Sequence, residues 1–260
     1  MTNWMYDPQA RLDICIVGQL SILMLIEEME MNNIKCFMSN TDGASFIVPK
    51  EKKELYNEIC AKWCKSTSYS LEETYFKKIF FQNVNSYIAQ TTNGKVKKKG
   101  NFITSTELHK NKSFRVIALA LEKYFIYNEN VEDFINNHNN IFDFVGRSSG
   151  TKTYYHKDIT NDIELPKLLR YYPTYHGRGF NIMKMVKEGN ETNAKNTSIE
   201  PADLPKITCN YLPKQDYEKH LENVNREWFI QQALEIIRPI ELKRKIKKKT
   251  IVPKEQLSLF

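Results

Sequence analysis

A long apolar segment near the N-terminus constrains the fold of this chain most strongly. The segment PQARLDICIVGQLSILMLIEEMEMNN follows Asp7 and runs from Pro8 to about Asn32. Aspartate followed by proline is a typical helix start, because the carboxylate caps free N–H groups and proline fits the first turn. We therefore predict one helix here. Its middle is apolar nearly all round, which predicts burial on most sides, and Gly18 within it would allow another backbone to approach closely.

A β-hairpin with one acidic residue at its tip is predicted directly after this helix. Residues 34–39 and 44–48 are two apolar runs joined by Asn40-Thr41-Asp42-Gly43. Asp-Gly between apolar runs is a strong hairpin signal. Turn chemistry alone explains Asp42, since aspartate in a turn often bonds only its own backbone. A role for its carboxylate beyond the turn is the alternative.

The rest of the chain mixes helical and strand-like patterns, which predicts an α+β fold. Leu55, Ile59 and Trp63 recur at every fourth position and indicate an amphipathic helix. The other predicted elements are strands near 73–81 and 84–91, a turn at Asn93-Gly94, helices from about Thr106 and over NVEDFINNHNN, short strands within 141–186, a polar loop at 187–204 and a helix near 221–238 that ends before Pro239.

Composition limits the functional classes. The 260 residues, 41% of them hydrophobic, allow one large domain or two smaller ones. No charge-free apolar run approaches the roughly 18–20 residues of a membrane helix, so no membrane partner is expected. The five cysteines are scattered, and the pair Cys60 and Cys64 lacks the further ligands of a zinc site. Free thiols in a reducing cytosol are therefore expected.

Most of the net charge lies at the C-terminus. Residues 241–260 contain seven Lys or Arg against two Glu, which gives +5 of the total +7. A basic tail suggests a polyanionic partner, most often nucleic acid. A merely solvated tail is equally consistent with the charge alone.

The hairpin and its flanking helices resemble the palm of family-B DNA polymerases of the bacteriophage type. MSNTDG (38–43) is similar to that family's C motif, usually written Tyr-Gly-Asp-Thr-Asp-Ser. Asn40 stands where the first aspartate is usual, and Gly43 where serine is usual. The resemblance implies that Asp42 is a catalytic residue and a ligand of the two Mg²⁺ ions.

A second stretch, NVNSYIAQTTNGKVKKKG (83–100), resembles the family's Lys-Lys-Arg-Tyr motif and the Lys-Gly that follows it. Tyr87 matches the tyrosine, whereas Val84, Asn85 and Ser86 depart from the basic residues. A solvated charged hairpin is the alternative. The resemblance implies that the DNA backbone is contacted by Tyr87, Lys95, Lys97, Lys98, Lys99 and Gly100.

Further stretches are similar to the polymerase thumb. They are NKSFRVIALALEKYFI, VEDFINNHNNIFDFV, LPKLLRYYPTYHGRG (165–179) and NVNREWFIQQALEII, so the resemblance covers roughly residues 6–240 in order. It implies that Arg170, Tyr171 and Tyr172 grip the emerging duplex.

The last residues, IVPKEQLSLF, resemble the short peptide by which bacterial replication proteins bind the sliding clamp. Leu257, Leu259 and Phe260 would fill apolar pockets, and Gln256 would bond at the rim. Packing of this end on its own thumb is the alternative. The basic linker with Pro253 favours a reach away from the body.

Several parts of such a polymerase do not occur in this sequence, namely the A motif (Asp-x-x-Ser-Leu-Tyr-Pro), the B motif of the fingers and the exonuclease domain. Two-metal phosphoryl transfer needs carboxylates that clamp both ions, and one aspartate cannot do this. Half of the palm sheet would also lack its partner strand, and an unpaired strand edge invites pairing with another chain. We therefore expect a second, N-terminal polymerase chain to supply these parts.

The sequence thus predicts a partial palm with an antiparallel sheet and packed helices (1–105), a mixed α/β thumb (106–240) and a flexible basic tail with the clamp-binding peptide (241–260). With its partner chain it would be a DNA-directed DNA polymerase that extends a primer on a template with dNTPs, in the cytoplasm of a bacterial host. Mg²⁺ would bind at a two-metal site shared by both chains. The alternative is an inactive DNA-binding and clamp-binding accessory protein, or a truncated remnant.

Overall fold

The structure, a computed structural model, is an α+β fold with antiparallel sheets, as the sequence predicts. It describes residues 7–41, 43–104, 114–189 and 193–250. The chain divides into two compact units: unit 1 comprises residues 1–99 and 247–260, and unit 2 comprises residues 100–246. The division after Lys99 lies a few residues before the boundary expected near residue 105.

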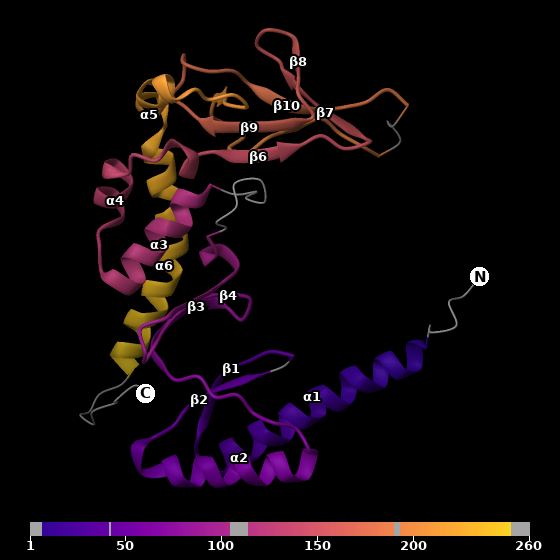
Figure 1. The fold of residues 1–260 in the computed structure, drawn as a ribbon, viewed down its shortest axis with the longest axis vertical. Helices are drawn as coiled ribbons and strands as arrows, with labels where there is room; N and C mark the ends of the chain where they lie inside the picture. The colour runs from indigo at the N-terminus through magenta and orange to yellow at the C-terminus, as the bar shows by residue number, and fades with distance from the viewer. Residues whose placement is uncertain (1–6, 42, 105–113, 190–192, 251–260) are drawn as a thin grey trace. The chain divides into compact units, whose positions relative to one another are not determined.

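The described part of unit 1 contains two helices and two small sheets (Figure 1). β1 and β2 form one antiparallel sheet, and β3, β4 and β5 form the other in that order. The elements are α1 (Pro8–Met31), β1 (Lys35–Ser39), β2 (Ala44–Ile47), a 3-10 turn (Lys50–Lys52), α2 (Lys53–Thr67), β3 (Phe76–Asn83), β4 (Ser86–Thr91) and β5 (Val96–Lys99).

α1 begins and ends close to the predicted positions. The Asp7 carboxylate accepts a hydrogen bond from the Ala10 N–H at 3.0 Å, and Pro8 occupies the first turn. Only the C-terminal half of the helix packs, because Ser21, Leu25 and Met29 are the buried residues of α1. The predicted burial on most sides is therefore wrong within this chain, since α1 carries more apolar surface than unit 1 covers.

The core of unit 1 joins this half of α1 to the amphipathic helix α2. Leu25 and Met29 of α1 pack with Ile34, Ile59 and Trp63. The Trp63 Nε1–H donates to the Ser21 carbonyl at 2.7 Å, so the indole satisfies its polar atom as it is buried. Ile59 and Trp63 lie on the face of α2 predicted from their spacing.

Unit 2 contains two sheets and four helices among its described residues. The strand orders are β12-β9-β6 and β11-β10-β7-β8. Its helices are α3 (Arg115–Tyr127), α4 (Val131–Asn137), α5 (Tyr217–Asn223) and α6 (Arg226–Thr250). The last four residues of α6, 247–250, are assigned to unit 1. The 3-10 turns are Gly100–Phe102, Ile141–Asp143 and Lys214–Asp216. Its strands are β6 (Gly146–Ser149), β7 (Tyr154–Asp158), β8 (Ile163–Leu165), β9 (Leu168–Pro173), β10 (Ile182–Val186), β11 (Thr197–Ser198) and β12 (Lys206–Thr208).

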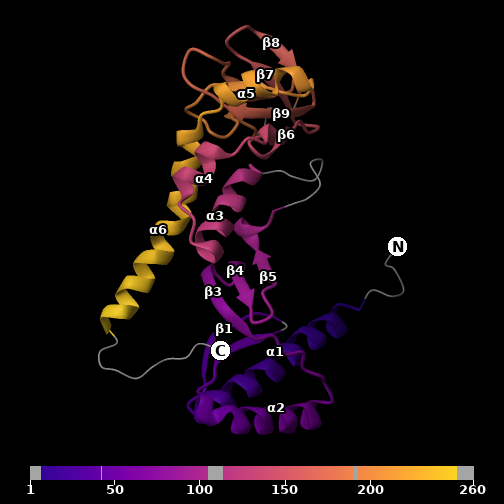
Figure 2. The same cartoon turned by 60° about the vertical axis from the view of Figure 1, so that its left-hand side comes forward.

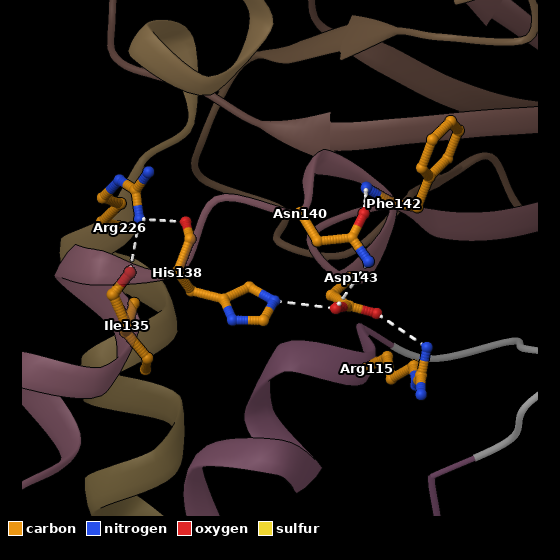
Figure 3. A network of polar contacts seen from close by, with 7 residues as sticks. All are labelled: Arg115, Ile135, His138, Asn140, Phe142, Asp143 and Arg226. Atoms are coloured by element: carbon orange, nitrogen blue, oxygen red, sulfur yellow. Dashed lines mark hydrogen bonds and ion pairs between the residues drawn. The ribbon is translucent and has the colours of Figure 1, made fainter. Parts of the chain in front are cut away.

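A buried carboxylate organises the helical part of unit 2 (Figure 3). Asp143 accepts hydrogen bonds from Arg115 at 3.0 Å and from the Asn140 amide at 3.0 Å, and it contacts His138 Nε2 at 2.7 Å. The Arg226 guanidinium at the start of α6 donates to the carbonyls of Ile135 and His138. These bonds fasten α3, α4 and α6 to the loop that leads into β6.

An aromatic cluster fills the space beside this network. The Phe114 ring lies 5.2 Å from the Trp228 ring, 5.3 Å from the Phe229 ring and 5.8 Å from the Tyr171 ring. A Cβ atom at Gly146 would lie 2.6 Å from Phe114 Cε1. A side chain at position 146 would therefore force this packed ring to move.

α6 continues through Pro239 to Thr250, so the predicted end before Pro239 is wrong. Proline inside a helix costs about 3 kcal/mol through a lost hydrogen bond and a clash with the preceding turn. An apolar stripe nevertheless runs past it, because Phe229, Ala233, Ile237 and Ile240 are all buried. Tertiary burial on both sides of Pro239 outweighs the local preference for a helix end.

Candidate functional site

The hairpin turn carries the residues around the expected metal ligand. The Asn40 N–H donates to the Gly43 carbonyl at 2.9 Å, which closes a tight turn between β1 and β2. Ser39, Asn40 and Thr41 are exposed to solvent. Asp42 itself lies outside the described residues. The described neighbours thus present oxygen-bearing side chains at an accessible turn.

The hairpin is held from below by the core of unit 1. Phe46 and Val48 pack against the buried cluster of α1 and α2, and the Phe46 ring lies 6.3 Å from the Tyr56 ring. Lys52 donates to the Asn32 carbonyl at 2.8 Å and ties the end of the hairpin to the end of α1. The pKa of Tyr56 is raised above its ordinary value, mainly by burial and to a lesser extent by the neighbouring Cys60, so this phenol stays neutral. The turn is therefore positioned by a packed base.

The two edges of this hairpin differ. On β1, the Cys36 N–H donates to the Glu30 carboxylate at 2.6 Å, so a side chain of α1 covers that edge. On β2, no other strand of the described chain pairs with Ala44–Ile47 besides β1. One N–H of the β1 edge is thus bonded within unit 1, whereas no described strand pairs along the outer edge of β2.

The basic stretch after Asn93-Gly94 forms β5, and its lysines divide between two faces. In the β4–β5 register Tyr87 lies opposite Lys99, Ala89 opposite Lys97, and Ile88 opposite Lys98. Side chains alternate along a strand, so Tyr87, Lys97 and Lys99 share one face and Lys98 points to the other. The structure thus brings together three of the predicted DNA contacts and separates a fourth.

The environment of Lys97, Lys95 and Gly100, three of the predicted DNA contacts, is also defined. Lys97 Nζ donates to Thr74 Oγ1 at 3.0 Å and lies 5.9 Å from the centre of the Phe76 ring. Lys95 is exposed at the β4–β5 turn, where its carbonyl accepts from the Thr91 N–H at 2.9 Å. Gly94 has φ of +85°, as expected for the predicted Asn-Gly turn. Gly100 follows β5 with φ of +63° and begins unit 2.

Unit 2 brings a second pair of cations together. In the β6–β9 register Arg147 lies directly opposite Arg170. Like charges directly opposite on a sheet are unfavourable. Arg170 is a predicted DNA contact, whereas Arg147, a lone basic residue in the short strand GRSS, is not among the residues predicted from the sequence.

The two tyrosines after Arg170 belong to the interior. Tyr171 and Tyr172 are exposed by only 5% and 0%. Burial raises the pKa of Tyr171 to about 12 and raises that of Tyr172 as well. The Tyr172 hydroxyl is 2.6 Å from His220 Nδ1, and burial lowers the pKa of His220, which fits a neutral imidazole that accepts this bond. Within unit 2 these side chains serve packing, which leaves Arg170 as the accessible member of the predicted group.

A serine–histidine pair in unit 2 has the spacing of a nucleophile and its base. Ser148 Oγ is 2.9 Å from His156 Nε2, and His156 Nδ1 is 3.2 Å from the Pro166 carbonyl. Both side chains are buried, and burial lowers the pKa of His156. A substrate has no access to them, so we assign this pair to the core of the sheets.

The described ranges contain neither a cluster of metal-ligating side chains nor a helix that could span a membrane. No group of three or more His, Cys, Asp or Glu residues within residues 7–41, 43–104, 114–189 and 193–250 is placed to hold a metal ion. The four cysteines of unit 1 and Cys209 of unit 2 are free thiols. Among the described helices, none is long and apolar enough to cross a membrane.

Comparisons with known proteins give no family assignment. No family model matches the chain. No curated protein matches it either.

Proposed function

We propose that this chain is the C-terminal part of a family-B DNA polymerase whose other half is a separate polypeptide. One observation carries the proposal: a tight, exposed turn on a hairpin that is packed on two helices and has one uncovered strand edge. The resemblance of MSNTDG to the C motif supports the same assignment. The partner chain brings the A motif, the fingers and the exonuclease.

Asp42 is the proposed Mg²⁺ ligand of this chain. The donor chemistry of the turn fits, because Ser39, Asn40 and Thr41 expose oxygen atoms of the kind that Mg²⁺ prefers. The remaining carboxylates of the two-metal site come from the partner chain. Bound Mg²⁺ would activate the primer hydroxyl and neutralise charge on the phosphates of the dNTP.

The basic faces of both units are the proposed contacts for primer–template DNA. Tyr87, Lys97 and Lys99 share one face of their sheet, and Arg147 lies opposite Arg170 in the other unit. Such contacts to phosphates are independent of base sequence and weaken as salt rises.

The clamp-binding peptide completes the proposal. Gln256, Leu257, Leu259 and Phe260 lie outside the described residues, beyond the end of α6 at Thr250. Binding to the sliding clamp would raise the effective concentration of the polymerase on DNA. Deletion of residues 256–260 should reduce processivity only when clamp is present. An equal loss without clamp would contradict a clamp-binding role.

Primer extension tests the catalytic assignment. The chain is combined with a polypeptide that carries motifs A and B, and extension is measured for the wild type, Asp42→Ala and the control Glu51→Ala, which removes an exposed carboxylate from the 3-10 turn after β2. We expect Asp42→Ala to reduce extension by at least a thousandfold, since it removes a metal ligand, while Glu51→Ala retains most activity. Full activity of Asp42→Ala would reject the assignment. DNA and clamp binding without any extension by the wild-type pair would favour the accessory protein.

DNA binding has its own matched test. The double variant Lys97→Ala, Lys99→Ala should lose about two phosphate contacts. The slope of log affinity against log salt concentration should therefore become shallower by about 0.9 for each lysine removed. Lys98→Ala is the control, because Lys98 points to the opposite face. Fluorescence anisotropy of labelled DNA over a salt series measures the slope for the double variant and for the control. Equal effects of the three lysines would show that the Tyr87 face is not the contact.

A further inference from the structure

The N-terminal half of α1, here called the arm (residues 8–20), exposes apolar side chains that unit 1 does not cover. Both views show this half projecting away from α2 (Figures 1 and 2). Large apolar side chains of α1 between 42% and 74% exposed are Leu12, Ile14, Ile16, Val17, Leu20, Leu23 and Met24. Leu25 and Met29, further along the same helix, are 5% and 0% exposed. Contiguous apolar surface of this kind marks an interaction site.

The exposed side chains spread over about 200° of the helix circumference, which is wider than a single stripe. Successive residues are about 100° apart, so Leu12 and Ile14 point in nearly opposite directions, and Val17 lies between them. Residues 14–26 contain no charged side chain. A helix that is apolar all round is normally buried, and a short isolated helix is only marginally stable in water. The arm is therefore suited to burial on several sides.

The charges of α1 do not favour a polyanionic occupant. The arm contains one basic residue, Arg11, balanced by Asp13, and the acidic residues Glu27, Glu28 and Glu30 follow in the other half of the helix. Nucleic acid and an anionic lipid surface both require basic residues beside the apolar ones. A protein is the occupant whose chemistry fits.

A second copy of this chain is a poorer occupant than a different polypeptide. Two arms paired about a two-fold axis cover one face of each helix and leave the other faces in water. An apolar groove covers a helix on several sides, as in recognition of a helix by a groove.

Gly18 supports close contact with that groove. Glycine in a helix interior costs about 1 kcal/mol relative to alanine. No heavy atom lies within 4 Å of a Cβ built at Gly18, so packing within this chain does not require glycine there. The predicted close approach of another backbone is absent from the surroundings that the structure describes. A partner backbone would supply it.

We propose that the arm docks into an apolar groove of the polypeptide that supplies the missing palm carboxylates. This inference rests on the proposed function and names the surface that joins the two chains. The same helix holds the β1–β2 hairpin through its buried half, with Lys52 bonded to Asn32 at the end of α1. Docking of the arm therefore fixes the turn that carries Asp42 relative to the partner.

The test measures binding of the full chain to the co-encoded polypeptide with motifs A and B by isothermal titration calorimetry. Ile16→Gln with Leu20→Gln changes the arm, and glutamine retains helix propensity. We expect the dissociation constant to rise at least tenfold. Leu242→Gln, an exposed leucine on α6, is the matched control and should change it less than twofold. Circular dichroism should show the same helix content in all variants.

A second variant addresses Gly18 and needs no loss of apolar surface. Gly18→Leu should leave the isolated chain folded, because the position is open, and should weaken the complex at least tenfold if a partner backbone lies against it.

Three results would overturn the inference. An active complex whose affinity is unaffected by the arm variants rejects the docking site and leaves the proposed function intact. A dimer of the isolated chain that the arm variants dissociate identifies a second copy as the occupant. Arm-dependent binding to phosphatidylglycerol vesicles identifies a lipid surface. If the wild-type chains form neither a complex nor product, the proposed function itself fails.

Discussion

The two units differ in how completely each one buries its apolar side chains and pairs its polar groups. In unit 2, Asp143 is surrounded by Arg115, His138 and Asn140, and the aromatic rings pack on one another. In unit 1, one half of α1 is packed and the other half exposes leucine and isoleucine, while β2 has an unpaired outer edge among the described strands. Unit 2 has the interior of an independent domain. Unit 1 leaves apolar helix surface exposed and one strand edge unpaired within the part of the chain that the structure describes.

The largest expected effect is on unit 2. Asp143→Ala should lower the free energy of unfolding by about 3–5 kcal/mol, because removing one partner leaves Arg115 and the rest of a buried network uncompensated. Urea denaturation followed by the fluorescence of Trp228 measures it. The exposed ion pair of Lys123 and Glu129 provides the control Glu129→Ala, which should leave the midpoint nearly unchanged. An effect of Asp143→Ala as small as the control would contradict the role given to the network.

A matched pair of leucines sharpens the comparison within α1. Leu25→Ala should destabilise unit 1 by about 2–5 kcal/mol, since it leaves a cavity in the core. Leu20→Ala, only five positions away and exposed, should change stability by no more than about 0.5 kcal/mol. Denaturation followed by Trp63 fluorescence compares them. Similar costs would mean that the arm is packed in the isolated chain.

Two histidines of unit 2, the buried His156 and the half-buried His220, should make its stability depend on pH. Burial lowers the pKa of both His156 and His220 below 6.5 in the folded chain. Below pH 6.5 the unfolded chain binds more protons, so stability is present above that pH and is lost as pH falls toward the lower folded pKa values. The slope should be at most about 1.4 kcal/mol per pH unit for each histidine.

Denaturation at pH 7.5, 6.5 and 5.5 measures this dependence. His156→Gln removes one of the two groups and should reduce the slope relative to the wild type. A slope unchanged by this substitution would show that His156 does not contribute.

The smallest effect is a gain of stability in unit 1. Gly18→Ala should stabilise the isolated chain by about 0.5–1 kcal/mol, because alanine favours the helix and its Cβ meets no atom within 4 Å. Thermal denaturation measures the shift. A loss of stability would reveal a close packing contact at this position within the chain.

Local signals in the sequence predicted the elements of unit 1 well. Asp7 and Pro8 mark the start of α1, the Asn40–Gly43 segment marks the hairpin, and Gly94 adopts the left-handed backbone that an Asn-Gly turn requires. These caps and turns are determined by residues adjacent in the chain, so they can be predicted from the sequence.

Features that depend on distant partners were not predictable in this way. The sequence of α1 indicates burial but cannot say whether the covering residues belong to the same chain. Pro239 suggested a helix end, yet burial of Ile237 and Ile240 extends α6 past it. The opposition of Arg147 and Arg170 arises from strand register, which no local pattern fixes.

The hydrogen bond from Cys36 to Glu30 has a consequence for self-association. A sheet grows into a fibre only if each added copy offers a new edge for the next one. With a carboxylate over one side of the hairpin and pairing groups on the other, two copies meeting edge to edge would close the growth at a pair. The same asymmetry leaves the β2 side as the more accessible edge among the described strands and works against amyloid-like stacking.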